Sequence, residues 1–304
     1  MGKLIKIPAA VLLVIFMLSG CAFSDPRIEG TPPPGPSVAA DFVQVADEVH
    51  AAWKAVASLP DSDQSASMAA TLASQWLILV GPDPLHRIPA VGGIGDPTPD
   101  PSLGDGTAGA DSALASARDD ALTHANASTG LATAFWAGLA AGLEQVRLGL
   151  TGPYEPAIAA DPAVTVTIMD ESTSLSNLIS QYEAGIFAIR SALGFLDPAS
   201  TDQSAFRVVL SSLQTDLAAL TGMAASSETT PSGQGIYELP PGRDSAAAMT
   251  LLSTTQKSLT ESSLVWAASA ADPSQATPYL MRNAALAMGY GLGTAVWPGW
   301  PDET

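Results

Sequence analysis

Cysteine is almost absent from this chain of 304 residues, because Cys21 is the only one. A single cysteine cannot form an intramolecular disulfide, so the fold must be stabilised by packing of apolar residues. Such residues are plentiful, since 47% of the chain is hydrophobic. The length is sufficient for one large or two modest domains, each with a core.

Basic residues are also scarce, with twelve Lys and Arg against thirty Asp and Glu. An acidic surface repels nucleic acid and anionic lipid, and no stripe of basic residues interrupts it. We therefore expect no nucleic-acid partner. We interpret the acidity as a source of solubility rather than as a means of capturing cations.

Histidine is scarce, and the usual catalytic motifs do not occur in this chain. The three histidines, His50, His86 and His124, all precede residue 171. The chain contains no Glu-x-x-His, which a di-iron helical bundle requires, and no Gly-x-Ser-x-Gly, Ser-x-x-Lys or P-loop pattern. Nucleophilic hydrolysis is thus unsupported, and we expect a non-catalytic protein without a bound cofactor.

The first twenty residues have the pattern of a signal peptide. Lys3 and Lys6 precede an apolar run over residues 7–18 that is short for a membrane span. The run ends in Leu-Ser-Gly-Cys at residues 18–21, which resembles the lipobox of bacterial lipoproteins. That resemblance implies cleavage after residue 20 and attachment of a diacylglycerol to Cys21.

Two acyl chains give the double anchor that stable membrane attachment requires. We therefore expect the protein to sit on the outer face of the cell membrane, tethered through Cys21. Residues 21–37 follow with five prolines and predict an extended spacer between the membrane and the body.

Residues 38–150 predict an N-terminal helical region. Apolar residues recur at three- and four-residue spacings over 39–59 and 61–80, with Asp61 or Ser62 as a possible cap. Residues 81–110 are rich in Gly, Pro and Asp and predict a loop. A longer helical pattern covers 111–150, where Gly130, Gly138 and Gly142 indicate either a break or the close approach of a neighbour.

Residues 171–301 predict four further helices, after a connector at 151–170 in which 164–168 could be extended. The apolar stripes and the Asp-Pro turns place the helices at about 171–196, 201–226, 244–270 and 275–296. Short connections between the first two and between the last two require antiparallel pairs. The expected fold class is all-α, an antiparallel four-helix bundle preceded by additional helices.

Three motifs in this segment resemble a known family: QYEAGIFAIRSALGFL, GIYELPPGRDSAAAM and YLMRNAALAMGYGLGTAVWPGWPDE. They are similar to the ferritin-like domain of unknown function found in lipoproteins of Gram-positive bacteria. The matching positions are Glu183, Tyr237, Leu239, Pro240, Arg282, Ala285, Trp297, Pro298 and Gly299. The second helix departs from the family, because Gln214 and Thr215 replace basic residues before Asp216. The resemblance implies a ferritin-like bundle and assigns no activity.

The acids of the bundle are the weak candidates for a metal site. If the helices run up and down in turn, Glu183, Asp216 and Glu261 lie at similar heights, yet the fourth helix offers no acid. Three carboxylates without histidine could hold one hard cation weakly. We favour a structural role for them, and specifically an ion pair between Glu183 and Arg282.

Three functions therefore remain. The first is a lipid-anchored scaffold or binding module for another envelope component, and the second is a metal-handling or redox protein with a degenerate ferritin-like site. The third is a small-molecule binder whose pocket is lined by aromatic residues, for which the candidates are Tyr182, Phe187, Trp266, Tyr279 and Tyr290. A homodimer is compatible with any of them.

Overall fold

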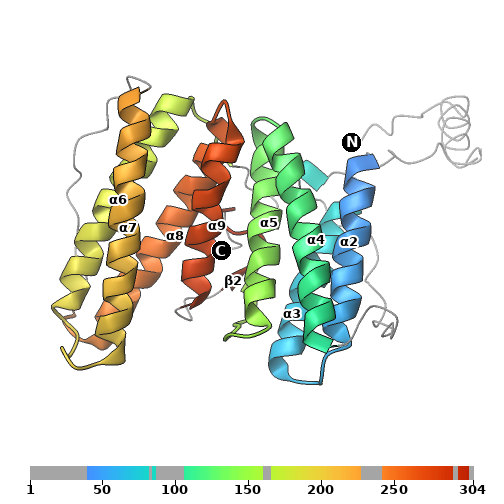
Figure 1. Ribbon diagram of the computed structural model, residues 1–304, viewed down its shortest axis with the longest axis horizontal. Coiled ribbons are helices and arrows are strands. Elements are labelled where there is room, and N and C mark those ends of the chain that lie inside the picture. The colour runs from blue at the N-terminus through green and yellow to red at the C-terminus, as the bar shows by residue number, and fades with distance from the viewer. Residues whose placement is uncertain are drawn as a thin grey trace, which may run out of the picture. The chain divides into compact units, whose positions relative to one another are not determined.

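The computed structural model describes residues 40–81, 84–86, 106–159, 166–226, 242–289 and 294–300. These residues form eight α-helices, one short 3₁₀ helix and two strands of two residues each (Figure 1). The predicted all-α class is confirmed. The predicted signal peptide, Cys21 and the spacer at 21–37 lie outside the described residues, as do Tyr237, Leu239, Pro240 and Tyr290.

The first four helices form a group that we name the first quartet. Its members are α2 (Ala40–Ala57), α3 (Asp63–Leu79), α4 (Gly106–Ala127) and α5 (Leu131–Gly149), and the 3₁₀ helix η1 (Pro84–His86) lies between α3 and α4. Ser62 caps α3, because its hydroxyl accepts from the backbone N–H of Ser65 while the Ser65 hydroxyl accepts from that of Ser62. Gly130, with φ of 61°, separates α4 from α5.

The last four helices form the second quartet. They are α6 (Glu171–Leu193), α7 (Thr201–Ser226), α8 (Ser245–Ser269) and α9 (Pro273–Gly289). Asp170 and Asp244 cap α6 and α8 by accepting a backbone N–H three residues onward. α7 has the length and hydropathy of a membrane span, yet Phe206, Leu213 and Leu220 on one side of it are fully buried in the bundle core.

The two quartets are arranged alike: corresponding helices have corresponding neighbours and run in corresponding directions. Gln44 and Glu48 of α2 meet Asp120 and Ser116 of α4 in reverse order, so α4 is antiparallel to α2. Tyr182 of α6 lies near Ser263 of α8, whereas Gly185 lies near Thr255, so α8 is antiparallel to α6. The third helix of each quartet thus runs in the same direction as the second. The up-and-down alternation considered for residues 171–296 is therefore wrong.

This topology follows from the connections. A short turn joins the first helix of each quartet to the second, and three residues join the third to the fourth. The middle connections are much longer, at residues 80–105 and 227–244. Only a long connection can carry the chain from one end of a bundle to the other, so the second and third helices can run in the same direction.

The predicted boundaries need three corrections. α4 begins at Gly106, inside the predicted loop of 81–110. The last helix ends at Gly289 instead of near 296, and Thr294–Ala295 forms strand β2. β2 pairs in parallel with β1 (Ala157–Ile158), which lies in the predicted connector, while residues 166–170 form no regular element.

Residues 294–300, which we name the C-terminal segment, pack against the first quartet. The Trp297 indole N–H donates to the Phe135 carbonyl at 2.8 Å, and the Gln75 amide donates to the Val296 carbonyl at 2.9 Å. A Cβ on Gly138 would lie 2.5 Å from the Trp297 ring. The α5 glycines therefore allow a close approach, as their positions predicted, although the neighbour is this segment rather than a helix.

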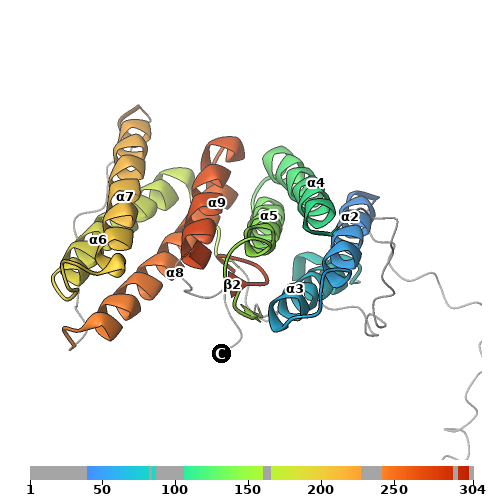
Figure 2. The ribbon, with the colours of Figure 1, turned by 60° about the horizontal axis from the view of Figure 1, so that its bottom comes forward.

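The two quartets share one compact unit, residues 38–304. α8 and α9 lie beside α5 (Figure 2). The core of the first quartet takes in Leu264, Leu280, Val296, Trp297 and Trp300 from the end of the chain. A second core lies among α6, α7, α8 and α9. The N-terminal helices thus do not form an independent domain.

Candidate binding site

A network of polar side chains lies at the centre of the second quartet. Asn283 donates to the Tyr182 hydroxyl at 3.0 Å and to the Ser263 hydroxyl at 2.9 Å, and Tyr182 donates to Asp216 at 3.4 Å. Tyr182, Ser263 and Asn283 have no exposed surface. Because each buried group has a partner, the network is compatible with a stable core.

Arg282 closes this network at the surface. Its guanidinium donates to Asp216 at 2.9 Å and lies 4.4 Å from the centre of the Tyr279 ring. Burial raises the pKa of the Tyr182 hydroxyl, and the charge of Asp216 raises it further, so Tyr182 remains a neutral donor. Asp216, Tyr279 and Arg282 border an open groove of about 620 Å³ between α7 and α9, where Val208 is 63% exposed.

The predicted ion pair is therefore wrong in one partner. Arg282 pairs with Asp216, and the described ion pairs include none between Arg282 and Glu183. The arrangement of the helices explains the difference, because Arg282 of α9 lies beside Asp216 of α7, whereas Glu183 belongs to α6. Sequence spacing alone could not decide which acid on which helix would meet the guanidinium.

The three predicted acids do not converge on one point. Asp216 faces Arg282 within the second quartet, whereas Glu261 lines a different pocket on α8. Within the described ranges, no group of three or more His, Cys, Asp or Glu side chains is close enough to hold a metal ion.

The predicted aromatic residues do not form one pocket either. Tyr182, Trp266 and Tyr279 are buried in the second core, and the last two rings are in contact, with their centres 5.4 Å apart. Phe187 is instead 42% exposed. Aromatic residues at helical spacing here contribute mainly to packing.

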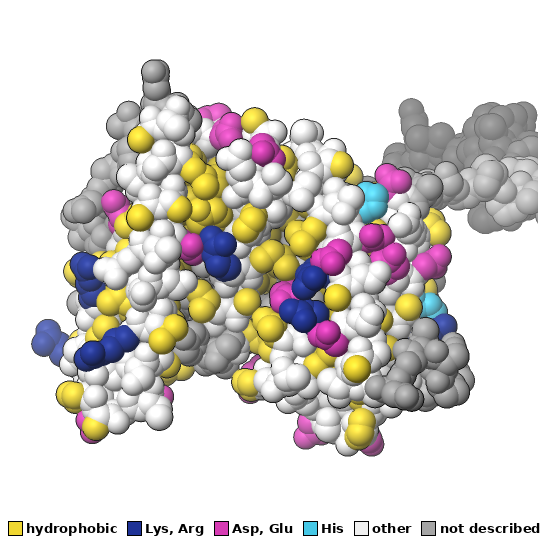
Figure 3. Space-filling view, in the orientation of Figure 1, with side chains coloured by type: hydrophobic (Ala, Val, Ile, Leu, Met, Phe, Trp, Pro, Cys, Tyr) yellow, Lys and Arg dark blue, Asp and Glu magenta, His cyan; other side chains and the backbone are white. Residues whose placement is uncertain are grey.

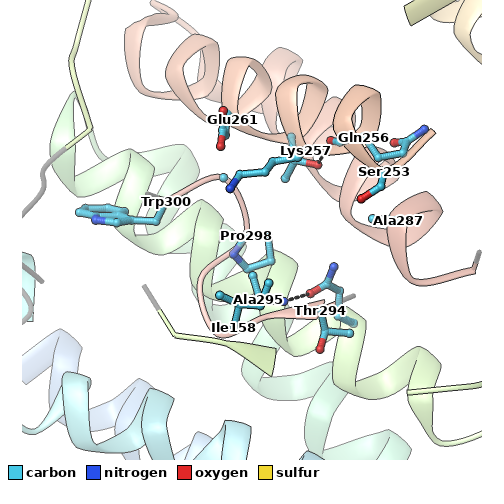
Figure 4. Close-up of a pocket in the computed structure, with 13 residues that line it drawn as sticks. Ile158, Ser253, Gln256, Lys257, Glu261, Ala287, Thr294, Ala295, Pro298 and Trp300 are labelled. Carbon is cyan, nitrogen blue, oxygen red and sulfur yellow. Dashed lines mark hydrogen bonds between the residues drawn. The ribbon is translucent and has the colours of Figure 1, made fainter. Parts of the chain in front are cut away.

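A pocket that the sequence did not predict lies where α8 meets the C-terminal segment. It has a volume of about 150 Å³, and we name it the α8 pocket (Figure 4). One wall is α8, with Ser253, Gln256, Lys257, Thr260 and Glu261. The remaining walls are Gln145 of α5, Ile158 of β1, Ala287 of α9, and Thr294, Ala295, Pro298, Gly299 and Trp300.

The walls opposite α8 are fixed by hydrogen bonds. The Gln145 side chain accepts from the Ala295 N–H, a bond drawn in Figure 4, and donates to the Ala284 carbonyl at 2.9 Å. Thr294 donates to the Glu155 carbonyl at 2.6 Å. Gly299 has φ of 81°, and a Cβ there would meet the Thr260 carbonyl oxygen at 2.9 Å. A glycine is thus required where this wall touches α8.

Gln256 is the unusual member of the pocket. Its side chain is 1% exposed, and neither amide atom has a hydrogen-bond partner in the part of the chain that the structure describes. A buried amide without a partner destabilises a fold by about 1–3 kcal/mol. When the two hairpins are aligned at their turns, the matching position in α4 is Leu114, which is fully buried. An apolar residue is therefore compatible with this place in a quartet.

The sequence held a signal for this residue. Gln256 falls between Leu252 and Leu259 on the apolar stripe of α8, where a polar side chain is unexpected. The pocket itself could not be predicted, because residues more than a hundred positions apart contribute its walls.

Two groups of charged residues lie on the first quartet. Burial, with the hydrogen bond and charge of Asp120, raises the pKa of Glu48 to about 7. Between α4 and α5, burial opposes ionisation of Glu144, but hydrogen bonds from Arg147 and Arg118 outweigh it and lower its pKa. Basic and acidic side chains accordingly lie together over α4 and α5 in Figure 3.

Comparisons of this chain with protein families, with curated proteins and with solved structures found no match.

Proposed function

We propose that this protein is a lipid-anchored, non-catalytic binding module of the cell envelope. The signal-peptide pattern and the Leu-Ser-Gly-Cys sequence at residues 18–21 support attachment through Cys21. The acidic composition suits a body held away from anionic lipid. The five prolines of residues 21–37 support the proposal of an extended spacer between the anchor and the body.

We also propose that the second quartet is a ferritin-like bundle that uses its centre for packing. Its support is the long crossover between the second and third helices, a connection typical of ferritin-like folds. Tyr182, Ser263 and Asn283 bond to one another at that centre. The Trp-Pro-Gly sequence that carries the family resemblance supplies part of the α8 pocket, through Pro298 and Gly299.

The binding function rests on one observation, which is the unpartnered amide of Gln256 at the wall of a pocket. Proteins retain such destabilising groups mainly where function needs them. The amide makes no hydrogen bond where it lies, so turning it toward the pocket breaks none. A small ligand in the α8 pocket would provide the missing partners.

The test is to extract the full-length protein from its own cells and to examine it by native mass spectrometry. We expect the wild-type protein to carry a small molecule that Gln256→Met, which keeps the side-chain length, does not carry. Equal spectra without any bound mass for the two proteins would contradict the binding function.

The stability of the same variant provides its control. Gln256→Met removes a buried unpartnered amide, so we expect the ligand-free protein to gain roughly 1 kcal/mol in free energy of unfolding. Gln75→Met removes the N–H that donates to the Val296 carbonyl, together with a buried amide oxygen that has no partner, so we expect this variant not to gain stability. Urea unfolding measures both, and loss of ligand from a more stable Gln256→Met protein cannot be attributed to misfolding.

A further inference from the structure

The lining of the α8 pocket combines a hydrogen-bonding group with balanced charge and apolar surface. Gln256 can offer two N–H donors and one acceptor in a plane. Lys257 and Glu261, one turn apart on α8, both line the pocket, and the figure shows them on the same side of it (Figure 4). Their charges are opposite, so the lining favours neither anions nor cations.

Much of the remaining lining is apolar, although Gln145, Ser253, Thr260 and Thr294 also line the pocket. Ile158, Ala287, Pro298 and Trp300 contribute the apolar part. Ile158 is 51% exposed, so the pocket opens to solvent beside β1. An ion of either sign would meet one attractive and one repulsive charge, and it would lose part of its hydration against the apolar surface. A neutral ligand meets no such penalty.

The size of the pocket limits the ligand further. A cavity of about 150 Å³ holds a molecule the size of benzene. The hydrogen-bonded walls at Ala295 and Thr294 limit its expansion. The pocket therefore suits a molecule, or one end group, of only a few heavy atoms.

We infer that the α8 pocket binds a neutral group that carries a hydrogen-bond donor beside an acceptor, with a carboxamide as the best match to Gln256. Two amides can pair through two parallel N–H to O=C bonds, which satisfies both ends of the Gln256 side chain. The short apolar chain attached to such a group would lie against Pro298 and Trp300. This inference rests on the proposed binding function and adds the ligand class to it.

Three probes with the same propyl chain and different head groups test the inference: butyramide, butyrate and n-butylammonium. Each is titrated into the full-length protein in detergent, and binding is followed by the ¹⁵N indole resonance of Trp300, which Trp300→Phe identifies. We expect butyramide to shift this resonance at concentrations about tenfold lower than the two ions require. Tenfold is the effect of about one neutral hydrogen bond.

Two variants make the test specific. Gln256→Met should abolish the preference for butyramide, and Gln256→Glu, which has the same shape and adds a negative charge, should move the preference to n-butylammonium. Tighter binding of either ion to the wild-type protein, or an unchanged preference in Gln256→Met, would overturn the ligand class and leave a binding pocket. If no probe shifts Trp300, the pocket does not bind small molecules, and both proposals fail.

Discussion

At the scale of single residues, three polar side chains, Asp216, Gln256 and Glu48, differ in whether a favourable partner contacts them. Asp216 is 10% exposed in its side chain, and Arg282 and Tyr182 both contact it. Gln256 has no such contact, and Glu48 shares its surroundings with another acid, Asp120. Asp216 therefore belongs to a structural ion pair, whereas Gln256 and Glu48 destabilise the fold where they lie.

Glu48 should make stability depend on pH. Its pKa is about 7 in the folded protein and about 4.5 when unfolded, so the folded state holds its proton more strongly. The contribution of Glu48 to the free energy of unfolding is therefore greatest below pH 4.5, and it falls as the pH rises to 7. Glu48→Gln removes the charge, and we expect it to stabilise the protein by about 1 kcal/mol at pH 8, a value reduced for partial exposure.

Urea unfolding at pH 4.5 and pH 8 measures this effect, which should vanish at the lower pH. Asp47→Asn is the matched control, because Asp47 is the adjacent acid and lies exposed on α2. If both variants stabilise the protein equally at pH 8, the gain comes from reduced net charge, and the coupling of Glu48 to Asp120 is not its source.

At the scale of helices and strands, the sequence predicted those elements whose signals are local. Ser62 at the start of α3, Asp170 before α6 and Asp244 before α8 are caps that can be read within four residues. The end of α9 could not be read in this way. Residues 289–296 contain three glycines, and the strand at Thr294–Ala295 depends on β1 and on Gln145 of α5, which lie far away in the sequence.

The same limit applied to the candidate site. Arg282 was recognised as half of an ion pair, but the choice of Asp216 required knowing that α9 lies beside α7 at this point. Gln256 was visible as a polar break in an apolar stripe, although its importance emerged only with the C-terminal segment in place. Local periodicity defines a helix face, whereas long-range contacts decide what that face meets.

The joint between α5 and the C-terminal segment should be sensitive to added volume. A Cβ on Gly138 would come within 2.5 Å of the Trp297 ring, which is fully buried and held by its bond to Phe135. We expect Gly138→Ala to destabilise the protein by about 1–3 kcal/mol, since neither the ring nor the helix can move freely. Thermal unfolding followed by circular dichroism measures the change.

Gly222→Ala is the matched control for this substitution. Gly222 lies in α7, and a Cβ there would have no heavy atom within 4 Å. Alanine should stabilise the helix at that position by roughly 0.5–1 kcal/mol. A neutral or stabilising Gly138→Ala would show that the contact with Trp297 is looser than the structure indicates.

At the scale of the whole molecule, the chain repeats one arrangement twice. The neighbours in the first quartet are α2 with α3 and α4, and α4 with α5; the second quartet has α6 with α7 and α8, and α8 with α9. β1, which follows the first quartet, pairs with β2, which follows the second quartet. The turn before α5 also meets the end of α8, through the Gly130 N–H and the Ala268 carbonyl.

This repetition was not visible in the sequence, because the matching positions share burial rather than identity. Five buried positions of α4 coincide with buried positions of α8 when the hairpins are aligned at their turns: Ala110 with Leu252, Leu114 with Gln256, Ala117 with Leu259, Ala121 with Ser263, and Ala125 with Ala267. A core needs apolar volume in total, so individual residues at such positions can differ widely. The α8 pocket breaks the repetition, since Gln256 stands where the first quartet has leucine.

The C-terminal segment makes the first quartet depend on the last residues of the chain. A chain ending at Gly293 loses the buried Trp297 and Trp300 and the bonds to Gln75 and Phe135. Loss of one buried tryptophan costs about 3–5 kcal/mol, and the two together approach the whole stability of an ordinary domain. We expect the first quartet of this variant to lose protection from hydrogen exchange, while the second quartet, whose core residues remain, keeps much of its own.

A chain ending at Trp300 is the control and should match the full-length protein. If the variant ending at Gly293 unfolds in one transition with an unchanged midpoint, the first quartet is stable by itself, and the segment serves only to form the α8 pocket.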